Sequence, residues 1–544
     1  MNTLTLLSKK EKQNIVFEGT PTVQQVLEDA GIFIPHPCGG IGKCGKCAIE
    51  VIGNISPPDE AELQAGCRLS CRTKLYGDAI VTLKNQPSSA SLIAEGFSEN
   101  IAPMVCQTKV PCDTSALYSV KSGHTKTAMH LSESQNNEQG LPLTTKIGAA
   151  VDIGTTTIAL SVYDLTTGYC LAAKSALNPQ SAVAADVIGR IDAAINGKLS
   201  TLQTMLVSCI RTLAEHTGYF SHMDTWCLTG NTTMLYLLCG RNPQSLAAAP
   251  YTADHLFDEE ISFLDKPAYL PACMHAFVGA DITCAVLASG MYHSAETTLL
   301  CDIGTNGEMA LWKNGVLYVT STAAGPVFEG TGISCGCQSV AGAIEKVSLR
   351  TSCKQKKSCF INHTPKKSSY NATPFSISTI ANATPIGICG SGIIDTVACL
   401  LNSGTLDETG YMEDDAFFLC EGISVTREDI RNIQLAKAAI AAGIRTLLEV
   451  TATAEAEIST FYLAGGFGKH LNLDSAVRIG LFPTELKDKV KVLGNAALQG
   501  AALMLTNKNA KKNAAFLAKT AKHINLGGNA AFNQYYIEEM FFPE

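Results

Sequence analysis

Two versions of one loop lie about 150 residues apart in this chain: Val151-Asp152-Ile153-Gly154-Thr155-Thr156-Thr157 and Cys301-Asp302-Ile303-Gly304-Thr305-Asn306-Gly307. Each version is expected to end one strand (147–153, 299–303) and to lead into another (158–163, 308–312). The glycine leaves the backbone open, so that N–H groups and threonine hydroxyls can surround phosphate oxygens, while the aspartate faces Mg²⁺ directly or through water. One such turn is a weak signal, but two at this separation predict a nucleotide phosphate site.

A third glycine-rich element is Phe461-Tyr462-Leu463-Ala464-Gly465-Gly466-Phe467-Gly468, where a buried-type strand runs into a turn. It resembles the adenosine motif of the actin, sugar-kinase and Hsp70 superfamily. The order of the three loops matches that superfamily over roughly residues 147–505. The resemblance implies an α/β fold of two lobes, each a mixed sheet flanked by helices, closing on ATP like a hinge. We assign residues 147–544 to this ATPase domain.

These loops, with two carboxylates elsewhere in the chain, supply the candidate residues of an ATP site. We expect Asp152 and Asp302 to position Mg²⁺. Asp281 and Glu329 are candidates to orient the attacking water, although a turn cap or a structural hydrogen bond is at least as good an explanation of either residue. The other expected contacts are Gly154, Thr155, Thr156, Gly304, Thr305, Asn306 and Gly307 for the phosphates, and Gly465, Gly466 and Gly468 for the adenosine.

A cysteine-rich loop lies near the N-terminus, in Pro37-Cys38-Gly39-Gly40-Ile41-Gly42-Lys43-Cys44-Gly45-Lys46-Cys47, with Cys67 and Cys71 further along. Four thiolates can ligate a 2Fe–2S cluster, and the glycines let backbone N–H groups approach its sulphides. A zinc site or free cysteines are the alternatives. Zinc sites favour paired C-x2-C units, and the loop holds only one, so we predict the cluster.

The segment around this loop has the pattern of a small α+β domain. Residues 3–7 and 14–18 alternate apolar and polar side chains across a lysine-rich turn, which predicts a hairpin. Residues 23–30 have helical spacing, and strands are expected at 48–52 and 79–84. A hairpin, a helix and two strands suggest a β-grasp layout.

Residues 1–85 together resemble the plant- and adrenodoxin-type ferredoxins. The Arg-Leu-small-Cys pattern of those proteins, present at residues 68–71, selects Cys71 as the fourth ligand and leaves Cys67 as a packed thiol. The resemblance therefore implies Cys38, Cys44, Cys47 and Cys71 as the cluster ligands.

Composition narrows the class of protein. At 544 residues the chain is too long for one hydrophobic core, so two or three domains are expected. A formal charge of −8 gives no basic footprint for nucleic acid. Residues 1–12 lack a signal-peptide pattern and no apolar run is long enough to span a bilayer, so we expect no membrane association. Of the 21 cysteines, the 16 that are scattered after residue 71 are then best explained as reduced thiols of a cytoplasmic protein.

Two segments interrupt this organisation. Residues 86–146 are rich in Ser, Thr, Asn and Gln, so we expect a flexible linker that lets the cluster visit a donor and an acceptor, or else a passive spacer. Residues 351–384 form a Lys/Ser/Asn-rich insertion. Cys335 and Cys337 form a C-x-C unit, but two thiols make half a metal site, and ordinary packing is the better explanation.

Further local signatures narrow the family. They are Asn178-Pro179-Gln180 with Asp186-Val187-Ile188, Thr229-Gly230-Asn231-Thr232-Thr233-Met234, Phe277-Val278-Gly279-Ala280-Asp281, Ala323-Ala324-Gly325-Pro326-Val327-Phe328-Glu329-Gly330 and Gly387-Ile388-Cys389-Gly390-Ser391-Gly392. With the ferredoxin-like front and the ending Met540-Phe541-Phe542-Pro543, the chain resembles the reductive activators of corrinoid proteins over nearly its whole length outside the linker.

That resemblance implies an activity, cofactors and partners. Such proteins use ATP with Mg²⁺, and a 2Fe–2S cluster, to return an accidentally oxidised Co(II) corrinoid to the Co(I) form needed for methyl transfer. The implied partners are a corrinoid protein and an upstream reductase or ferredoxin, and a homodimer is expected. Fuller members carry a small ordered domain where this chain has about 60 weakly patterned residues, and this departure affects how the cluster is held during transfer.

The need for ATP follows from redox energetics. Plant-type clusters have potentials near −400 mV, and each ~59 mV of unfavourable potential lowers a one-electron equilibrium about tenfold. An acceptor ~200 mV lower costs about 4–5 kcal/mol, which nucleotide binding and hydrolysis can supply by biasing a conformational equilibrium. We therefore expect closure of the lobes to change how this chain binds the corrinoid protein.

Three other functions share part of this pattern. Activators of 2-hydroxyacyl-CoA dehydratases have the same nucleotide fold but bind one 4Fe–4S cluster between two subunits, and the N-terminal ferredoxin loop argues against them. A small-molecule kinase has no use for a cluster. An electron carrier with a nucleotide-sensing domain is the alternative that is not an enzyme.

Overall fold

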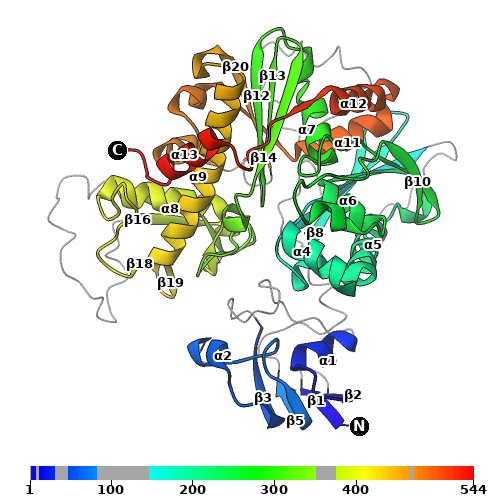
Figure 1. The fold of residues 1–544 in the computed structure, drawn as a ribbon, viewed down its shortest axis with the longest axis vertical. Coiled ribbons are helices and arrows are strands. Elements are labelled where there is room, and N and C mark those ends of the chain that lie inside the picture. The colour runs from blue at the N-terminus through cyan, green and yellow to red at the C-terminus, as the bar shows by residue number, and fades with distance from the viewer. Residues whose placement is uncertain are drawn as a thin grey trace.

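The computed structural model describes residues 2–7, 12–30, 47–65, 67–82, 146–350, 375–465 and 471–544 (Figure 1). Several sequence-based predictions lie outside these ranges: Cys38, Cys44, Gly466, Gly468, the predicted linker up to residue 145, and residues 351–374 of the predicted insertion. The described residues form an N-terminal unit with one five-stranded sheet and a larger part with two six-stranded sheets.

The N-terminal unit consists of β1 Asn2–Leu7, β2 Lys12–Phe17, α1 Val23–Asp29, β3 Ala48–Ile55, α2 Glu60–Ala65, β4 Arg68–Leu69 and β5 Leu75–Thr82. Its sheet has the order β2-β1-β5-β3-β4, with β1 antiparallel to β2 and parallel to β5. Leu6 and Val81 from the sheet pack with Leu27 of α1 in one core. The predicted α+β fold is confirmed, but β5 begins four residues before the predicted strand because Leu75 is already buried in that core.

The larger part contains two sheets of the same design. The strands of the first are β6 Ile147–Ile153, β7 Thr157–Asp164, β8 Cys170–Leu177, β9 Met223–Gly230, β10 Glu259–Phe263 and β11 Lys266–Leu270, and those of the second are β12 Thr297–Ile303, β13 Gly307–Lys313, β14 Val316–Thr322, β20 Ile458–Ala464, β21 Val490–Gly494 and β22 Lys522–His523. In each sheet three consecutive strands form an antiparallel meander, and a later strand pairs parallel with the first of them. The repeat in the sequence is therefore a repeat in the structure, and the predicted two-lobed α/β architecture is confirmed.

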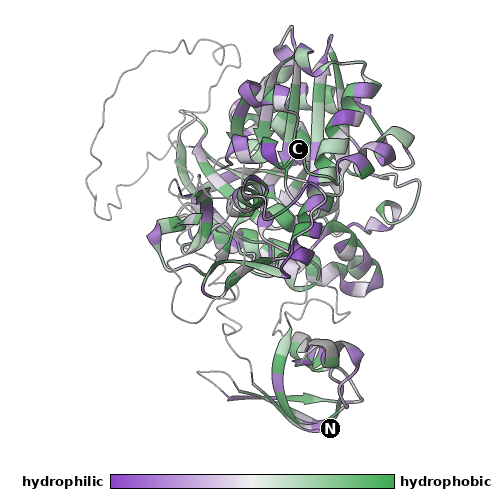
Figure 2. Ribbon diagram, turned by 90° about the vertical axis from the view of Figure 1, so that its left-hand side faces the viewer, coloured by the Kyte–Doolittle hydropathy of each residue, from purple (hydrophilic) through white to green (hydrophobic). Residues whose placement is uncertain are grey.

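Helices cover both sheets, and the ribbons of the central strands are mainly apolar (Figures 1 and 2). The helices are α4 Val187–Ala193, α5 Leu199–Glu215, α6 Thr232–Leu238, α7 Ala280–Ser289, α8 Gly390–Ser403, α9 Arg427–Val450, α10 Leu473–Arg478, α11 Ala496–Thr506, α12 Lys508–Thr520 and α13 Ala530–Glu538. Two small sheets complete the second lobe: β15 Ala343–Leu349 with β16 Phe375–Thr379 and β17 Gly387–Ile388, and β18 Ala416–Cys420 with β19 Ile423–Thr426. None of the described helices combines the length and the apolar character that crossing a bilayer requires.

Helices α7 and α11 pack against each other and connect the two lobes. Ile282 of α7 shares a core with Leu300 of the second sheet, whereas α11 packs on β6 and β9 of the first. Gly500 lets the two helices approach closely, because an added Cβ there would lie 2.1 Å from the carbonyl oxygen of Cys284. A shift of either helix therefore moves both lobes.

Candidate functional site

The two repeated loops meet between the lobes. Asp152 lies near the end of β6 and Asp302 near the end of β12, and the hydroxyls of Thr156 and Thr305 in the following loops are 3.3 Å apart. Glu329, which ends the short 3₁₀ turn Pro326–Glu329, accepts a hydrogen bond from Thr305 (3.0 Å) and another from Thr156. One carboxyl group thus joins the candidate phosphate loops of both lobes.

Each loop is closed by the N–H of its glycine. Gly154 donates to the carbonyl of Thr157, and Gly304 donates to that of Asn306, both at 3.0 Å. An added Cβ at Gly304 would lie 3.4 Å from Oε1 of Glu329, so a side chain there would narrow the space beside that carboxyl group. Each turn is therefore tight, and its glycine leaves room for a phosphate to approach the backbone.

Three side chains of the first lobe hold the first loop in place. Asn178 donates to the carbonyl of Gly154 (2.8 Å), Asn231 donates to the hydroxyl of Thr155 (3.2 Å), and Arg190 donates to the carbonyl of Thr155 (2.6 Å). Burial lowers the pKa of Arg190 to about 9, and nearby carboxylates oppose that shift. Two of the sequence signatures, those at 178–180 and 229–234, are therefore supports for the loop.

Carboxyl groups gather where the strands end. Burial, Asp281 and Asp152 raise the pKa of Asp302 to about 8, and burial and Asp152 raise that of Asp281 to about 7. Burial raises the pKa of Asp152 to about 6, against a hydrogen bond from Asn495 (2.8 Å). Glu308 on β13 is buried, and burial with Asp281 and Asp302 raises its pKa well above the usual range. These groups repel one another because little water separates them.

The arrangement suits a divalent cation that arrives with a phosphate ligand. Among the described residues, no group of three or more His, Cys, Asp or Glu side chains forms a ready-made metal cage. Mg²⁺ is commonly held by one or two carboxylates plus phosphate and water oxygens, so Asp152 and Asp302 fit this role without a cage. Position 465 requires glycine for two reasons. Its φ of +103° disfavours a side chain, and an added Cβ would lie 3.0 Å from Oδ1 of Asp302 and 2.6 Å from the carbonyl oxygen of Ile303.

The signatures at 323–330 and 387–392 pack backbone against backbone beside Glu329. An added Cβ at Gly390 would lie 1.9 Å from the carbonyl oxygen of Phe328, and one at Gly387 would lie 2.7 Å from Sγ of Cys337. Cys335 is likewise a packing position, since its sulphur accepts from the N–H of Ser424 (3.4 Å). These glycines position the turn that carries Glu329.

Sequence reasoning missed three residues of this site: Glu308, Arg190 and Asn495. Glu308 could have been found as the acidic residue that directly follows the second loop, and a hydrogen bond from Asn306 opposes the rise in the pKa of its carboxyl group. Arg190 and Asn495 have no local signal, because their partners are far away in the chain.

The predicted phosphate contact Gly307 is the first residue of β13, where an added Cβ would lie 3.1 Å from the side chain of Thr322.

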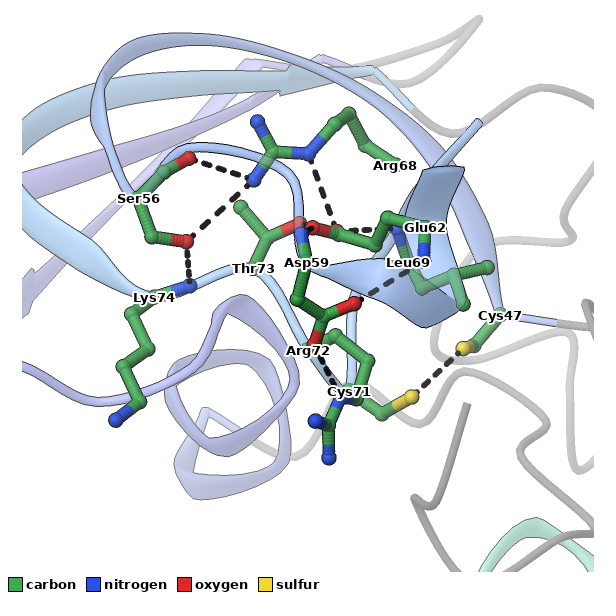
Figure 3. Close-up of polar contacts among 10 residues, drawn as sticks. All are labelled: Cys47, Ser56, Asp59, Glu62, Arg68, Leu69, Cys71, Arg72, Thr73 and Lys74. Carbon is green, nitrogen blue, oxygen red and sulfur yellow. Dashed lines mark hydrogen bonds and ion pairs between the residues drawn. The ribbon is translucent and has the colours of Figure 1, made fainter. Parts of the chain in front are cut away.

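The N-terminal unit brings two of the expected cluster ligands together (Figure 3). The Sγ atoms of Cys47 and Cys71 are 3.2 Å apart, and Ser70 donates its N–H to the carbonyl of Cys47 (2.9 Å). The hydroxyl of Ser70 is fully buried and has no hydrogen-bond partner within the described part of the chain. Two converging thiols and a buried donor beside them fit an iron–sulphur cluster.

Glu62 holds the segment that carries Cys71. Its carboxylate accepts from the N–H of Leu69 (2.9 Å), the Nε of Arg68 (3.1 Å) and the hydroxyl of Thr73 (Figure 3). Burial raises the pKa of Glu62, but these hydrogen bonds outweigh burial and place the pKa below its usual value. The ionised carboxylate of Glu62 therefore stabilises the fold of this unit.

The fold and the two sites define a class: a ferredoxin-type iron–sulphur domain joined to a two-lobed nucleotide-binding domain. Residues 8–76 match the 2Fe–2S iron–sulphur cluster binding domain, residues 147–294 the RACo middle region, and residues 296–544 the C-terminal domain of RACo, the ASKHA domain. The chain belongs to the RACo family, the reductive activators of corrinoid proteins.

Similar proteins match this chain over most or nearly all of its length. The corrinoid activation enzyme RamQ of Eubacterium limosum is 29% identical and covers 96% of this chain and 96% of its own. A reductase of a Co(II) methylated amine-specific corrinoid protein from Methanosarcina barkeri is 25% identical, over 73% of this chain and 77% of its own. The solved structure of a reductive activator for corrinoid, iron–sulphur protein is 26% identical with a TM-score of 0.65, and the match covers 99% of this chain and 98% of that one.

Replacing Glu62 by alanine is expected to weaken cluster retention. The change leaves the N–H of Leu69 and the hydroxyl of Thr73 without their acceptor, which costs about 1–3 kcal/mol and loosens the segment before Cys71. We expect the visible absorbance of the iron–sulphur protein to decay about tenfold faster under a chelator. Glu60→Ala, an exposed position on the same helix, is the matched control. Equal decay of the two variants would contradict the anchoring role.

Replacing Asp302 by asparagine is expected to stabilise the chain at alkaline pH. A carboxyl pKa raised to about 8 means that the fold loses stability as pH rises from about 4 to about 8, and an amide removes that loss. Without nucleotide or divalent cation, the thermal midpoint should rise by about 2–5 °C at pH 8 and by less than about 1 °C at pH 5. Asp414→Asn, an exposed position, should change neither value. A lower midpoint for Asp302→Asn at pH 8 would refute the electrostatic assignment.

Proposed function

We propose that this chain uses ATP to drive the one-electron reduction of a corrinoid protein from Co(II) to Co(I). The observation that carries the proposal is the presence in one chain of an iron–sulphur domain and an ASKHA domain, matched end to end by a reductive activator for corrinoid, iron–sulphur protein. The names of the relatives from E. limosum and M. barkeri describe the same kind of activity.

The proposed ligands of a 2Fe–2S cluster are Cys38, Cys44, Cys47 and Cys71. When bound, the cluster supplies a one-electron carrier. The 3.2 Å approach of the Cys47 and Cys71 sulphurs supports this ligand set. Cys67 is proposed as a packed thiol, since its side chain is partly buried against the core of the N-terminal unit.

The proposed ATP site lies between the two repeated loops. Asp152 and Asp302 hold Mg²⁺ together with the phosphates, and the buried carboxyl group of Glu308 interacts electrostatically with Asp302. The proposed phosphate contacts are Gly154, Thr155, Thr156, Gly304, Thr305, Asn306 and Gly307, and the proposed adenosine contacts are Gly465, Gly466 and Gly468.

Two carboxyl groups are proposed to act on the attacking water. Asp281 has a pKa raised to about 7, which suits a group that accepts a proton near neutral pH. Glu329 already accepts from Thr156 and Thr305, so a phosphate entering between the loops competes for the same hydroxyl donors. Positioning and charge neutralisation of this kind are sufficient for slow phosphoryl transfer to water.

Lobe movement is the proposed link between hydrolysis and electron transfer. Asp281 lies on α7, which packs on both lobes, so loss of the γ-phosphate alters contacts on both sides. The bias needed for an acceptor ~200 mV below the cluster is about 4–5 kcal/mol. The proposed partners are the corrinoid protein as acceptor, a reductase or ferredoxin as donor, and a second copy of the chain in a homodimer.

An anaerobic assay tests the proposal. The chain is mixed with a Co(II) corrinoid protein and a low-potential reductant, and Co(I) absorbance is followed with ATP, with a non-hydrolysable analogue and without nucleotide. We expect Co(I) to accumulate with ATP, but not with the non-hydrolysable analogue or without nucleotide. Asp302→Ala is expected to retain the iron–sulphur spectrum and to lose more than about 90% of the ATP-dependent Co(I), since it removes a metal-positioning carboxylate.

Two cysteine variants serve as a matched pair in the same assay. Cys71→Ser is expected to lose the iron–sulphur spectrum and Co(I) formation, and Cys67→Ser is expected to keep both. Co(I) formation that is equal with and without ATP would overturn the proposal that hydrolysis drives the reduction.

A further inference from the structure

The charge of this chain is unevenly distributed. Residues 489–537 contain seven lysines and no aspartate or glutamate. The whole chain has a formal charge of −8, so the remainder carries −15. This positive segment includes α12 and the short strand β22 that follows it.

Helix α12 presents part of that charge on its outer face. Its inner face is apolar, with four buried residues: Ala510, Ala514, Leu517 and Ala518. The outer face carries one row of exposed side chains at helical spacing: Lys508, Lys512, Phe516 and Lys519. We call these four residues the α12 stripe. Figure 1 shows α12 on the outer rim of the larger part.

The lysines of the α12 stripe are not used in ion pairs within the described part of the fold. Lys511 pairs with Glu260 (3.2 Å) and lies 4.2 Å from the ring centre of Tyr269, and Lys522 lies over Tyr318. By contrast, Lys508, Lys512 and Lys519 form no ion pair with any residue that the structure describes.

The aromatic residue of the stripe is the second observation. Phe516 is 65% exposed, at the centre of a row of lysines. Exposing an aromatic ring to water is unfavourable, whereas burying it in a partner contributes strongly to binding. Three unpaired positive charges around one exposed ring match the layout of a protein interface, in which an aromatic anchor is surrounded by a polar, solvent-accessible rim.

We propose that the α12 stripe is the docking surface for an acidic face of the corrinoid protein, with Phe516 entering an apolar recess between the partner's carboxylates. The inference rests on the proposed function for the nature of the partner. Lys508 and Lys519 are about 16 Å apart along the helix, a length that fits within one standard protein interface.

The same observations favour a protein over other anionic partners. Three unpaired lysines give a duplex too few phosphate contacts for firm binding, and a single exposed ring between them offers no stacking platform for successive bases. Helix α12 also packs on α7, the helix that carries Asp281. Leu517 and Ala518 share a core with Val278 and Ile282, so the inner face of α12 belongs to the same core as the helix that carries this proposed water-orienting carboxyl group.

Binding of the stripe variants to the Co(II) corrinoid protein that the wild-type chain reduces tests the inference. The charge-reversal variant Lys508→Glu/Lys512→Glu/Lys519→Glu should associate about 10- to 100-fold more slowly at low salt and lose most of its salt dependence. Phe516→Ala should raise the Kd about 10- to 30-fold. ATP hydrolysis by the isolated variants should stay within about twofold of wild type, since none of these residues touches the ATP site.

Two controls keep the result specific. Lys508→Arg/Lys512→Arg/Lys519→Arg keeps the charge and should bind like wild type, and Phe418→Ala removes a ring that is 50% exposed elsewhere, on β18. If the charge-reversal variant bound the corrinoid protein as the wild-type chain does, the proposed docking surface would be refuted and the proposed function would be unaffected. Absence of Co(I) with the wild-type chain would overturn the proposed function itself, and the docking surface with it.

Three further measurements separate the other possible occupants. Sedimentation reports whether charge reversal dissociates a dimer, and binding is also measured to vesicles containing phosphatidylserine and to a short DNA duplex. The proposal expects no difference between wild type and charge reversal in any of the three. A loss confined to the dimer, the vesicle or the duplex, with corrinoid protein binding unchanged, would overturn it in favour of that occupant.

Discussion

Repulsion among five carboxyl groups is the constraint on which this site depends. Asp152, Asp281, Asp302, Glu308 and Glu329 are largely enclosed by protein, and burial raises the pKa of each. The topology forces this proximity, because the first strands of the two meanders end at the same place between the lobes. The proposed cation, held together with phosphate, would relieve this repulsion, and its binding would thereby be linked to the relation of the two lobes.

The same design principle, a charged group fixed by hydrogen bonds, appears in both functional units. Arg190 fixes the backbone of the first phosphate loop from inside the first lobe, and Glu62 fixes the segment before Cys71 in the ferredoxin-type unit. Each is buried, so its loss leaves unpaired donors or acceptors rather than a solvated gap. Both groups therefore maintain the geometry of their sites without contacting a substrate.

Sequence reasoning succeeded where a local pattern carries the physics. The repeated Asp-Ile-Gly-Thr loops and the hairpin at the N-terminus are short motifs whose turn chemistry is contained in consecutive residues, and the predicted fold and family are confirmed. It failed where partners are distant in the chain. Arg190 reads as an ordinary helical arginine, and Asn495 reads as a helix cap until the fold brings it to Asp152. The charge of the α12 stripe was hidden by the net charge of the whole chain.

Calorimetric titration with Mg–ATP at pH 7, in two buffers of different ionisation enthalpy, tests the electrostatic account most directly. Carboxyl groups with pKa values near 7 and 8 carry protons at this pH, and an arriving cation lowers those values. The account predicts the release of about one proton per nucleotide bound at pH 7, falling toward zero at pH 9. Proton uptake, or no exchange at all at pH 7, would contradict it.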